Sequence, residues 1–212
     1  MLLSPAFLKL LEGEDPDLTS FAEKVEHLLS LYPRENVYAM YVPSGSHDTE
    51  RLFTKLKEDI GKTKLFYLFQ MAYPGAPAIY YGDEIGLDGG KDPECRKAFP
   101  WKESNWQVEI REWVKRLIAL RKRNPALRRG DFKRLVLDKE QGLYGFTRSM
   151  GEESIIVILN FSKEKQNISI PCKSLNWGEG RKVSDLLSIQ NYTVSKGNLR
   201  ISLPPWSGTW IA

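Results

Sequence analysis

The stretch at residues 37–51, V-Y-A-M-Y-V-P-S-G-S-H-D-T-E-R, decides the fold. Its first six residues are apolar without alternation, and a Pro-Ser-Gly turn signal at 43–45 closes them. Such an unbroken run predicts a strand over 37–42 that is buried on both faces, as in a parallel sheet covered by helices. His47 and Asp48 follow the end of this strand, where barrel enzymes carry their catalytic groups. We therefore treat both as candidate site residues; a hydrogen-bonded turn or helix cap is the alternative.

The segments around this stretch alternate between helix and strand. Apolar residues at helical spacing predict a helix over 20–32, with Ser20 and Glu23 placed as a capping box. Residues 64–73 are apolar all round, which predicts a helix packed on both sides. Residues 77–81 then predict a second short buried strand. The order of helix and strand is the βαβ rhythm of a parallel sheet.

A further helix completes this first part of the chain. Ser104 and Gln107 have capping spacing before an apolar helical face, and Asn124-Pro125 marks the helix end. The densest basic run, 121–129, lies at that end, where cations complement the helix dipole. We expect these cations to be solvated; a phosphate-binding patch is the alternative.

Beyond Gly130 the pattern changes to short strands separated by turn signals. This spacing predicts an antiparallel sandwich or Greek key. The predicted division is therefore into domains 1–128 and 129–212. The expected strands cover residues 132–137, 143–148, 154–160, 167–170, 181–185, 192–194, 199–203 and 208–211.

The composition limits the class of protein. Lys and Arg number 31 against 27 Asp and Glu, and a net charge of +4 is too small to indicate nucleic-acid binding. Cys95 and Cys172 match no metal-ligand spacing, and neither His27 nor His47 completes a ligand set. We expect no cofactor, no metal, no membrane span and no signal peptide. The two cysteines indicate no disulfide framework, so we expect a reducing, cytoplasmic location.

Three motifs together resemble the alpha-amylase family of glycoside hydrolases (family 13), in its cyclomaltodextrinase, neopullulanase and maltogenic amylase branch. S-H-D-T-E-R at 46–51 resembles the family's conserved block after the seventh barrel strand. P-G-A-P-A-I-Y-Y-G-D-E-I-G at 74–86 resembles the block on the eighth strand. D-P-E-C-R at 92–96, with Pro100-Trp101, is similar to a loop that holds sugar near subsite −2. The implied fold is the C-terminal portion of a (β/α)8 TIM barrel, from about helix 6 to helix 8, followed by an antiparallel β-sandwich.

The resemblance implies roles for four residues. Retaining glycosidases use a carboxylate nucleophile and a carboxylic acid, aided by hydrogen bonds to the sugar that strengthen in the transition state. A third family carboxylate supplies such bonds beside a histidine, and these roles fall on Asp48 as catalytic residue and His47 as substrate-binding residue. Asp92 and Arg96 would contact the −2 sugar; a loop salt bridge is the alternative. The substrate would be an α-glucan oligosaccharide.

The family's nucleophile and acid/base blocks do not occur before His47. A complete barrel takes about 250 residues, so we expect only its last third, inactive alone. Three interpretations stay open: a piece of a glycosidase, a non-catalytic glucan-binding module, or a subunit that completes another chain's barrel. A chain supplying the missing strands, or a homo-oligomer, is the expected partner. Asp83 and Glu84 are expected to hold neighbouring loops.

Overall fold

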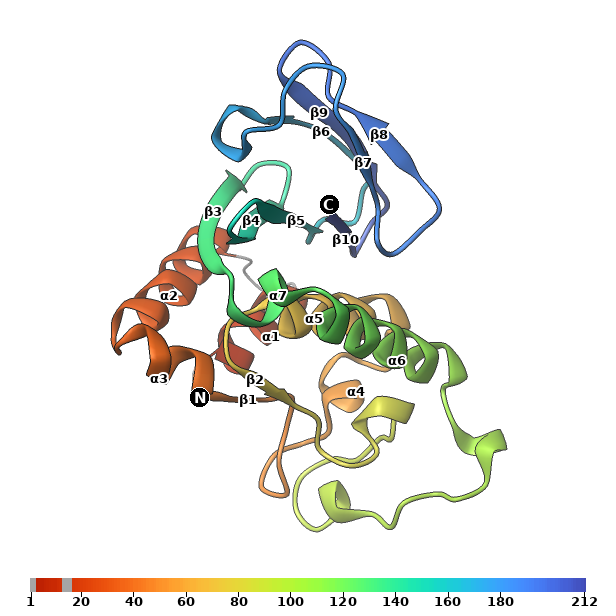
Figure 1. Cartoon of the computed structure of the whole chain (residues 1–212). Helices are drawn as coiled ribbons and strands as arrows, with labels where there is room; N and C mark the ends of the chain where they lie inside the picture. The colour runs from red at the N-terminus through yellow and green to blue at the C-terminus, as the bar shows by residue number, and fades with distance from the viewer. Residues whose placement is uncertain (1–2, 13–16) are drawn as a thin grey trace. The chain divides into compact units, whose positions relative to one another are not determined.

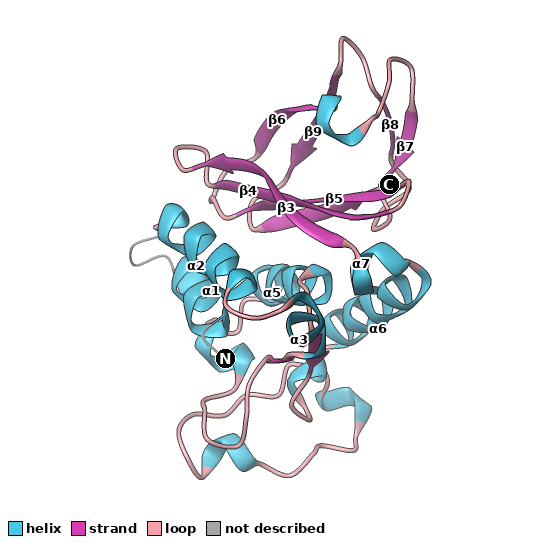
Figure 2. Ribbon diagram, turned by 60° about the vertical axis from the view of Figure 1, so that its left-hand side comes forward, coloured by secondary structure: helices cyan, strands magenta, loops and turns pink. Residues whose placement is uncertain are grey.

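The computed structural model describes residues 3–12 and 17–212, which form two compact units divided between Arg123 and Asn124 (Figure 1). The first unit is helical with one parallel strand pair, and the second is built from strands (Figure 2). Helices of the first unit are α1 (Leu3–Glu12), α2 (Leu18–Ser30), α3 (Arg34–Ala39), α4 (Leu52–Lys55), α5 (Ile60–Ala72) and α6 (Val108–Arg123). Its 3-10 turns are η1 (Asp83–Ile85), η2 (Glu94–Arg96) and η3 (Glu103–Asn105).

The strand pair of the first unit is short. β1 (Tyr41–Pro43) pairs in parallel with β2 (Ala76–Ala78), and Pro43 is opposite Ala78. The strand predicted over 77–81 therefore begins at Ala76 and ends early. Its predicted burial is wrong, because no residue of β2 is buried and Tyr81 beyond it is 40% exposed. The parallel direction agrees with the βαβ rhythm of the sequence.

The prediction of a strand over 37–42 buried on both faces is wrong. Residues 37–39 belong to α3, which begins after Pro33, where the amide of Val37 donates to the Pro33 carbonyl over 3.1 Å, and only residues 41–42 lie in β1. Only Val37 and Val42 are buried, while Tyr41 is 69% exposed. A proline with fixed φ is well suited to a helix start. Periodicity cannot separate a short buried strand from a short helix, because both give an unbroken apolar run.

Helix α5 forms the centre of the first unit, and the prediction that it packs on both sides is confirmed. Its residues 65–72 are all buried. Phe69 stacks on Phe7 of α1, with ring centroids 4.6 Å apart. Gln70 donates from Nε2 to the carbonyls of Val42 (2.9 Å) and Ala78 (3.0 Å). This buried amide therefore fixes α5 against both strands that lead into the candidate site.

Two predicted helix caps are wrong. Helix α2 is capped by Asp17, whose Oδ1 accepts from the amide of Ser20 over 2.9 Å, so Ser20 is inside the helix. Asp is as good an N-cap as Ser, and it lies one turn earlier. Ser104 belongs to η3, and α6 begins only at Val108.

The prediction that the cations at the end of α6 are solvated is wrong for Arg121. Its side chain is buried and donates to the carbonyls of Met71 (2.7 Å), Tyr73 (3.2 Å) and Gly75 (2.6 Å). Those carbonyls lie at and beyond the end of α5, where the helix itself supplies no donors. Gly75 has φ +110°, and a Cβ there would lie 2.8 Å from the Met40 carbonyl, so this turn into β2 requires glycine. The remaining cations of the run, Lys122, Arg123, Arg128 and Arg129, are exposed.

The second unit contains all eight predicted strands, and every pairing is antiparallel. One sheet has the order β10-β5-β4-β3, and two further sheets are β6-β9 and β7-β8. A short helix, α7 (Pro125–Arg129), packs on β4 and β5. The strands are β3 (Asp131–Asp138), β4 (Leu143–Met150), β5 (Glu153–Asn160), β6 (Gln166–Pro171), β7 (Lys182–Ser184), β8 (Asn191–Thr193), β9 (Asn198–Leu203) and β10 (Ser207–Ile211).

The core of the second unit is formed by apolar residues from all three sheets. Its members include Ile158, Ile170, Trp177, Leu199 and Ile211, each at most 3% exposed. The alternation along β9, with Leu199, Ile201 and Leu203 buried, is the period of a half-buried strand. Local alternation therefore determines which face of β9 enters the core.

Candidate active site

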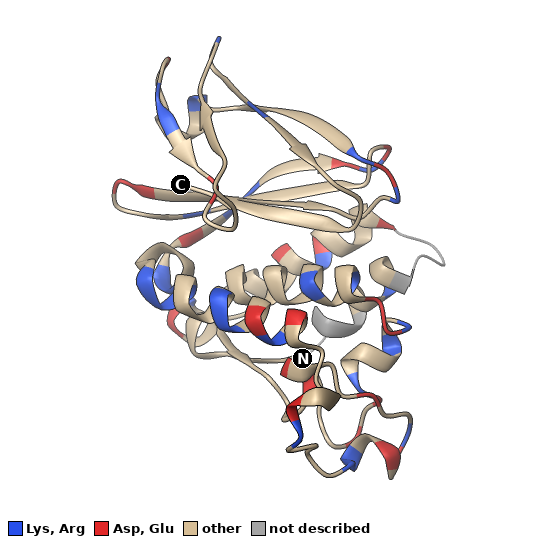
Figure 3. Ribbon diagram, turned by 90° about the vertical axis from the view of Figure 1, so that its right-hand side faces the viewer, with Lys and Arg blue, Asp and Glu red and all other residues tan. Residues whose placement is uncertain are grey.

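The parallel pairing of β1 and β2 places two loops at one end of the sheet. Because parallel strands end on the same side, the loop at residues 44–51 after β1 and the loop at 79–97 after β2 leave together. The amide of Ser44 donates to the carbonyl of Ala78 over 2.9 Å and extends this contact beyond the strands. Charged residues of both signs are present among the loops of the first unit (Figure 3).

Arg96 joins the four candidate residues into one cluster. Its Nε lies 2.8 Å from Asp92 Oδ1 and donates to the His47 carbonyl over 3.2 Å. Its Nη2 lies 3.5 Å from Asp48 Oδ1, and His47 Nε2 lies 3.2 Å from that same oxygen. The tertiary structure thus brings together all four residues that the sequence singled out.

The cluster is accessible to a ligand. The side chain of Asp48 is 68% exposed and that of Arg96 is 49% exposed. Exposed ion pairs of this kind contribute only about 0–1 kcal/mol, because water screens them. Hydroxyl groups of a ligand can therefore replace the pairs at small cost. The backbone at Asp48 is held locally, since its amide donates to Ser46 Oγ over 3.2 Å.

Below the exposed cluster lies a buried layer that the sequence did not identify as functional. Cys95 is fully buried, and its Sγ donates to the His47 carbonyl over 3.1 Å. Arg51 is also buried, and its Nη1 donates to the Tyr81 carbonyl and lies 3.2 Å from Asp83 Oδ1. Each of these two side chains belongs to one loop and contacts the other loop. The sequence signal that could have identified Arg51 and Cys95 is their position inside the motifs at 46–51 and 92–96.

Aromatic rings enclose the Arg51 guanidinium. Its Cζ lies 4.3 Å from the ring centroid of Tyr80 and 4.5 Å from that of Tyr81. A desolvated cation–π contact contributes about 2 kcal/mol. The ring of Tyr81 is further fixed by a bond from its hydroxyl to the Lys97 carbonyl, 2.8 Å long. These contacts fix the loop after β2 around one buried cation.

Asp83 is the anionic partner within this layer. Burial raises the pKa of its carboxyl to about 6, against the opposing effects of Arg51 and of Ser44, whose Oγ donates to Asp83 Oδ2 over 3.1 Å. Ser44 follows β1, whereas Asp83 follows β2. This contact joins the loops that follow β1 and β2, which is the role expected of Asp83. Among the described residues, no three His, Cys, Asp or Glu side chains are grouped to hold a metal ion.

Comparisons with known proteins agree with the motifs. Residues 14–108 match the alpha amylase catalytic domain, and residues 134–210 match the maltogenic amylase C-terminal domain. A cyclomaltodextrinase of Geobacillus thermopakistaniensis (strain MAS1) is 40% identical over 204 residues, which are 96% of this chain and 34% of that protein. Neopullulanase 2 of Thermoactinomyces vulgaris is 36% identical over 84% of this chain and 30% of its own length.

Solved structures extend the similarity to the fold. A cyclomaltodextrinase structure superposes with a TM-score of 0.89 at 29% identity, over 99% of this chain and 36% of that one. A debranching enzyme from Nostoc punctiforme gives a TM-score of 0.79 at 34% identity, over 92% of this chain and 39% of that one. The helical unit is accordingly part of a barrel, and an antiparallel β domain follows it.

This chain spans about a third of the length of the curated relatives that it matches. Both motif-bearing loops and the β domain lie within the matched residues. The chain therefore belongs to the alpha-amylase family of glycoside hydrolases.

Proposed function

We propose that this chain is the C-terminal portion of a retaining α-glucan glycoside hydrolase, with Asp48 as its transition-state-stabilising carboxylate. The supporting observation is the cluster in which Arg96 contacts Asp48, Asp92 and the His47 carbonyl. Relatives named cyclomaltodextrinase and neopullulanase support an α-glucan as substrate. In this proposal the catalytic part ends near residue 128, and the C-terminal domain begins at 129.

Asp48 would act by accepting hydrogen bonds from ring hydroxyls. Such bonds strengthen as positive charge develops on the sugar, so they favour the transition state over the bound substrate. His47 Nε2, 3.2 Å from Asp48, would serve as a neighbouring donor to the same sugar. Arg96 presents a planar fork of donors and Asp92 an acceptor 2.8 Å away, a combination that suits adjacent hydroxyls of the next sugar.

In this proposal the nucleophile and the acid/base come from barrel strands outside this chain. Without that carboxylate pair, only positioning and modest electrostatics remain. The chain alone is therefore expected not to hydrolyse maltotriose, pullulan or cyclodextrins. Turnover of maltotriose by the homogeneous chain, unchanged by Asp48→Asn, would refute this proposal.

A chimera tests the assignment of Asp48. The matching C-terminal third of the Geobacillus cyclomaltodextrinase is replaced by this chain, and cyclodextrin hydrolysis is measured. We expect activity in the chimera and a fall in kcat of about 100-fold or more with Asp48→Asn. Glu50→Gln, next to the site but outside the cluster, is the control and should retain activity. Equal kcat in the Asp48→Asn and parent chimeras would exclude the role.

We also propose a cytoplasmic location. Cys95 and Cys172 are both free and buried, as in proteins of reducing compartments. A relative from Bacillus subtilis is named intracellular maltogenic amylase. No helix in the described part of the chain has the length and apolar character needed to cross a membrane. Fractionation of the source cells, followed by detection of the chain with an antibody, tests the location.

A further inference from the structure

The turn that carries Arg96 depends on contacts with other segments of the first unit. Turn η2 ends at Arg96, and the Lys97 amide closes it by donating to the Glu94 carbonyl over 3.3 Å. A single 3-10 turn is marginal alone, because it closes few hydrogen bonds. The Arg96 side chain is 49% exposed, so its own packing does not fix the turn. The position of Arg96 is therefore set by the residues that hold η2.

Before Arg96 in the chain, Cys95 anchors the turn to the loop after β1. Its side chain is fully buried, and its Sγ donates to the His47 carbonyl over 3.1 Å. Arg96 Nε donates to the same carbonyl over 3.2 Å, but it also lies 2.8 Å from Asp92 Oδ1. Because Nε carries one proton, its bond to His47 weakens when Asp92 or a ligand takes that proton. The buried thiol is shielded from such competition, so its bond keeps the turn in place.

After Arg96, Tyr81 anchors the same turn to the segment that follows β2. Its hydroxyl donates to the Lys97 carbonyl over 2.8 Å. The ring is held in turn, because its centroid lies 4.5 Å from Arg51 Cζ and 4.6 Å from the centroid of Tyr80. A tyrosine ring is rigid, so fixing the ring also fixes the place of its hydroxyl. The residues on both sides of Arg96 are thus bonded to the segments that follow the two parallel strands.

Turn η2 also packs directly on the backbone of Gly89. A Cβ at this position would lie 2.6 Å from the Glu94 carbonyl oxygen and 3.2 Å from Cys95 Cα, so this close approach requires glycine. Gly89 is itself fixed, since its carbonyl accepts from the Arg51 amide over 2.9 Å and its amide donates to Thr54 Oγ1 over 2.8 Å. The turn therefore lies against the end of the loop after β1 and the start of α4.

We infer that Tyr81 and Cys95 are positioning residues, which hold the Arg96 guanidinium at the distance from Asp48 that one glucan chain requires. This inference rests on the proposed function, in which Asp48 binds the reacting sugar and Arg96 the next sugar. A displacement of about 1 Å can cost on the order of 100-fold in rate. The exposed Arg96–Asp48 contact of 3.5 Å cannot keep the distance by itself, because sugar hydroxyls replace it.

Two activated substrates test this inference in the cyclomaltodextrinase chimera. α-Glucosyl fluoride supplies only the reacting sugar, whereas α-maltosyl fluoride also supplies the next one, and fluoride release is measured for both. The ratio of kcat/KM for maltosyl over glucosyl fluoride therefore reports the gain from the second sugar. We expect this ratio to fall about tenfold in Arg96→Ala and about tenfold in Tyr81→Phe, with the glucosyl fluoride value changed less than about threefold.

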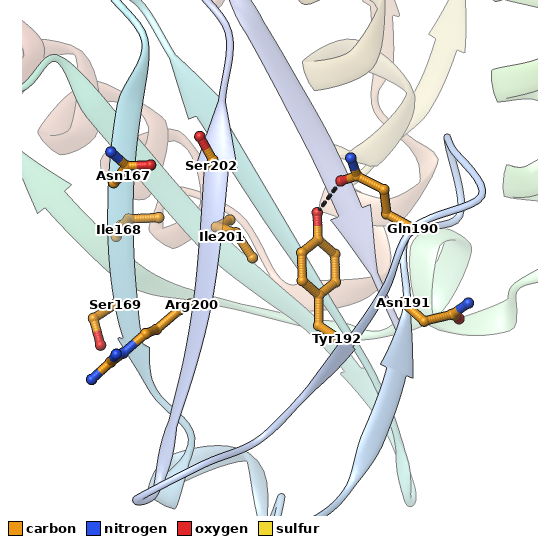
Figure 4. A pocket seen from close by; sticks show the side chains of 9 residues that line it. All are labelled: Asn167, Ile168, Ser169, Gln190, Asn191, Tyr192, Arg200, Ile201 and Ser202. Carbon is orange, nitrogen blue, oxygen red and sulfur yellow. Dashed lines mark hydrogen bonds between the residues drawn. The ribbon is translucent and has the colours of Figure 1, made fainter.

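Substitutions of Cys95 separate the donor from the shape of the side chain. Cys95→Ser and Cys95→Ala leave nearly the same space, but only serine retains a hydrogen-bond donor. We expect the ratio to fall about fivefold in Cys95→Ala and to stay near that of the parent in Cys95→Ser. Tyr192→Phe is the matched control, because it also removes one tyrosine hydroxyl, which donates to Gln190 Oε1 over 2.6 Å in the second unit (Figure 4). This control should leave the ratio unchanged.

A double-mutant cycle shows whether Tyr81 acts through Arg96. In the Arg96→Ala background, Tyr81→Phe should lower the ratio no further, because the guanidinium that it positions is gone. A merely structural role would instead lower kcat/KM for both fluorides by the same factor in either background. That result would overturn the inference.

The Nε–H signal of Arg96 gives a readout that needs no catalysis. In the isotope-labelled full chain, its NMR order parameter should fall in Tyr81→Phe and Cys95→Ala and stay near that of the parent in Cys95→Ser. Unchanged order parameters, or unchanged ratios in these two variants beside a lower ratio in Arg96→Ala, would overturn the inference and leave the proposed function standing. An unchanged ratio in Arg96→Ala would refute the sugar-binding role of Arg96, and the inference would fall with it.

Discussion

Arg96 Nη2 lies 3.5 Å from Asp48 Oδ1, and this contact joins the loop after β2 to the loop after β1. The same guanidinium contacts Asp92 and the His47 carbonyl, so one side chain sets the spacing of the whole cluster. Since Asp48 and Arg96 are exposed, their contact orders the site without closing it. Asp48 and Arg96 are nevertheless expected to act on different steps.

Arg96→Ala in the chimera should raise KM for cyclodextrin about tenfold and change kcat less than threefold. Its bonds to the −2 sugar would be equally strong in substrate and transition state, and such uniform binding affects KM. Asp48→Asn should instead lower kcat with little change in KM. Lys97→Ala, next in sequence, is the control and should leave both constants near those of the parent. The same kinetic pattern for Arg96→Ala and Asp48→Asn would show that the assigned roles are wrong.

Arg51→Met should destabilise the chain by about 3–5 kcal/mol, because it leaves Asp83 buried without its cation. Guanidinium denaturation, followed by circular dichroism, measures the change. The control is Lys97→Ala, which removes the exposed Lys97–Asp88 pair of 2.6 Å and should cost about 0–1 kcal/mol. Equal losses in the two variants would show that the buried pair has no special role.

The free energy of unfolding should fall as pH rises from about 4 to about 6.5, through the Asp83 carboxyl. Its pKa is raised to about 6 in the folded chain by burial, so the folded state binds more protons than the unfolded state over this range. The stabilisation from the Asp83 carboxyl is fully present below its pKa in the unfolded chain, and it is lost as the pH rises past its pKa in the folded chain. Asp83→Asn should flatten this part of the profile. An identical slope in the variant would assign the dependence to other groups.

The free chain should form a dimer or larger assembly, or bind the chain that supplies the remaining barrel strands. β1 and β2 pair only with each other in the described part of the chain, and Tyr41 on β1 is 69% exposed. Unpaired strand edges recruit other strands. Sedimentation at low micromolar concentration measures the state, and Tyr41→Lys should shift it toward monomer. A monomeric parent chain without dye-binding apolar surface would contradict the expectation.

The sequence alone determined the features that depend on local pattern. Short runs separated by turn signals predicted the eight strands of the second unit, because turn residues mark strand ends locally in the sequence. The all-round apolar character of 64–73 likewise predicted the buried helix α5. The motifs at 46–51 and 92–96 named the candidate site residues, since these residues lie within single short segments.

Tertiary structure decided what depends on partners far away in the sequence. The first half of the run at 37–42 became helix, and Arg121 became buried because the carbonyls of Met71, Tyr73 and Gly75 need donors there. Only the parallel pairing of β1 with β2 placed Arg96 against Asp48. A hydrogen bond or ion pair between distant segments leaves no periodic trace in either one, so these contacts follow from the packing of the chain and not from its local pattern.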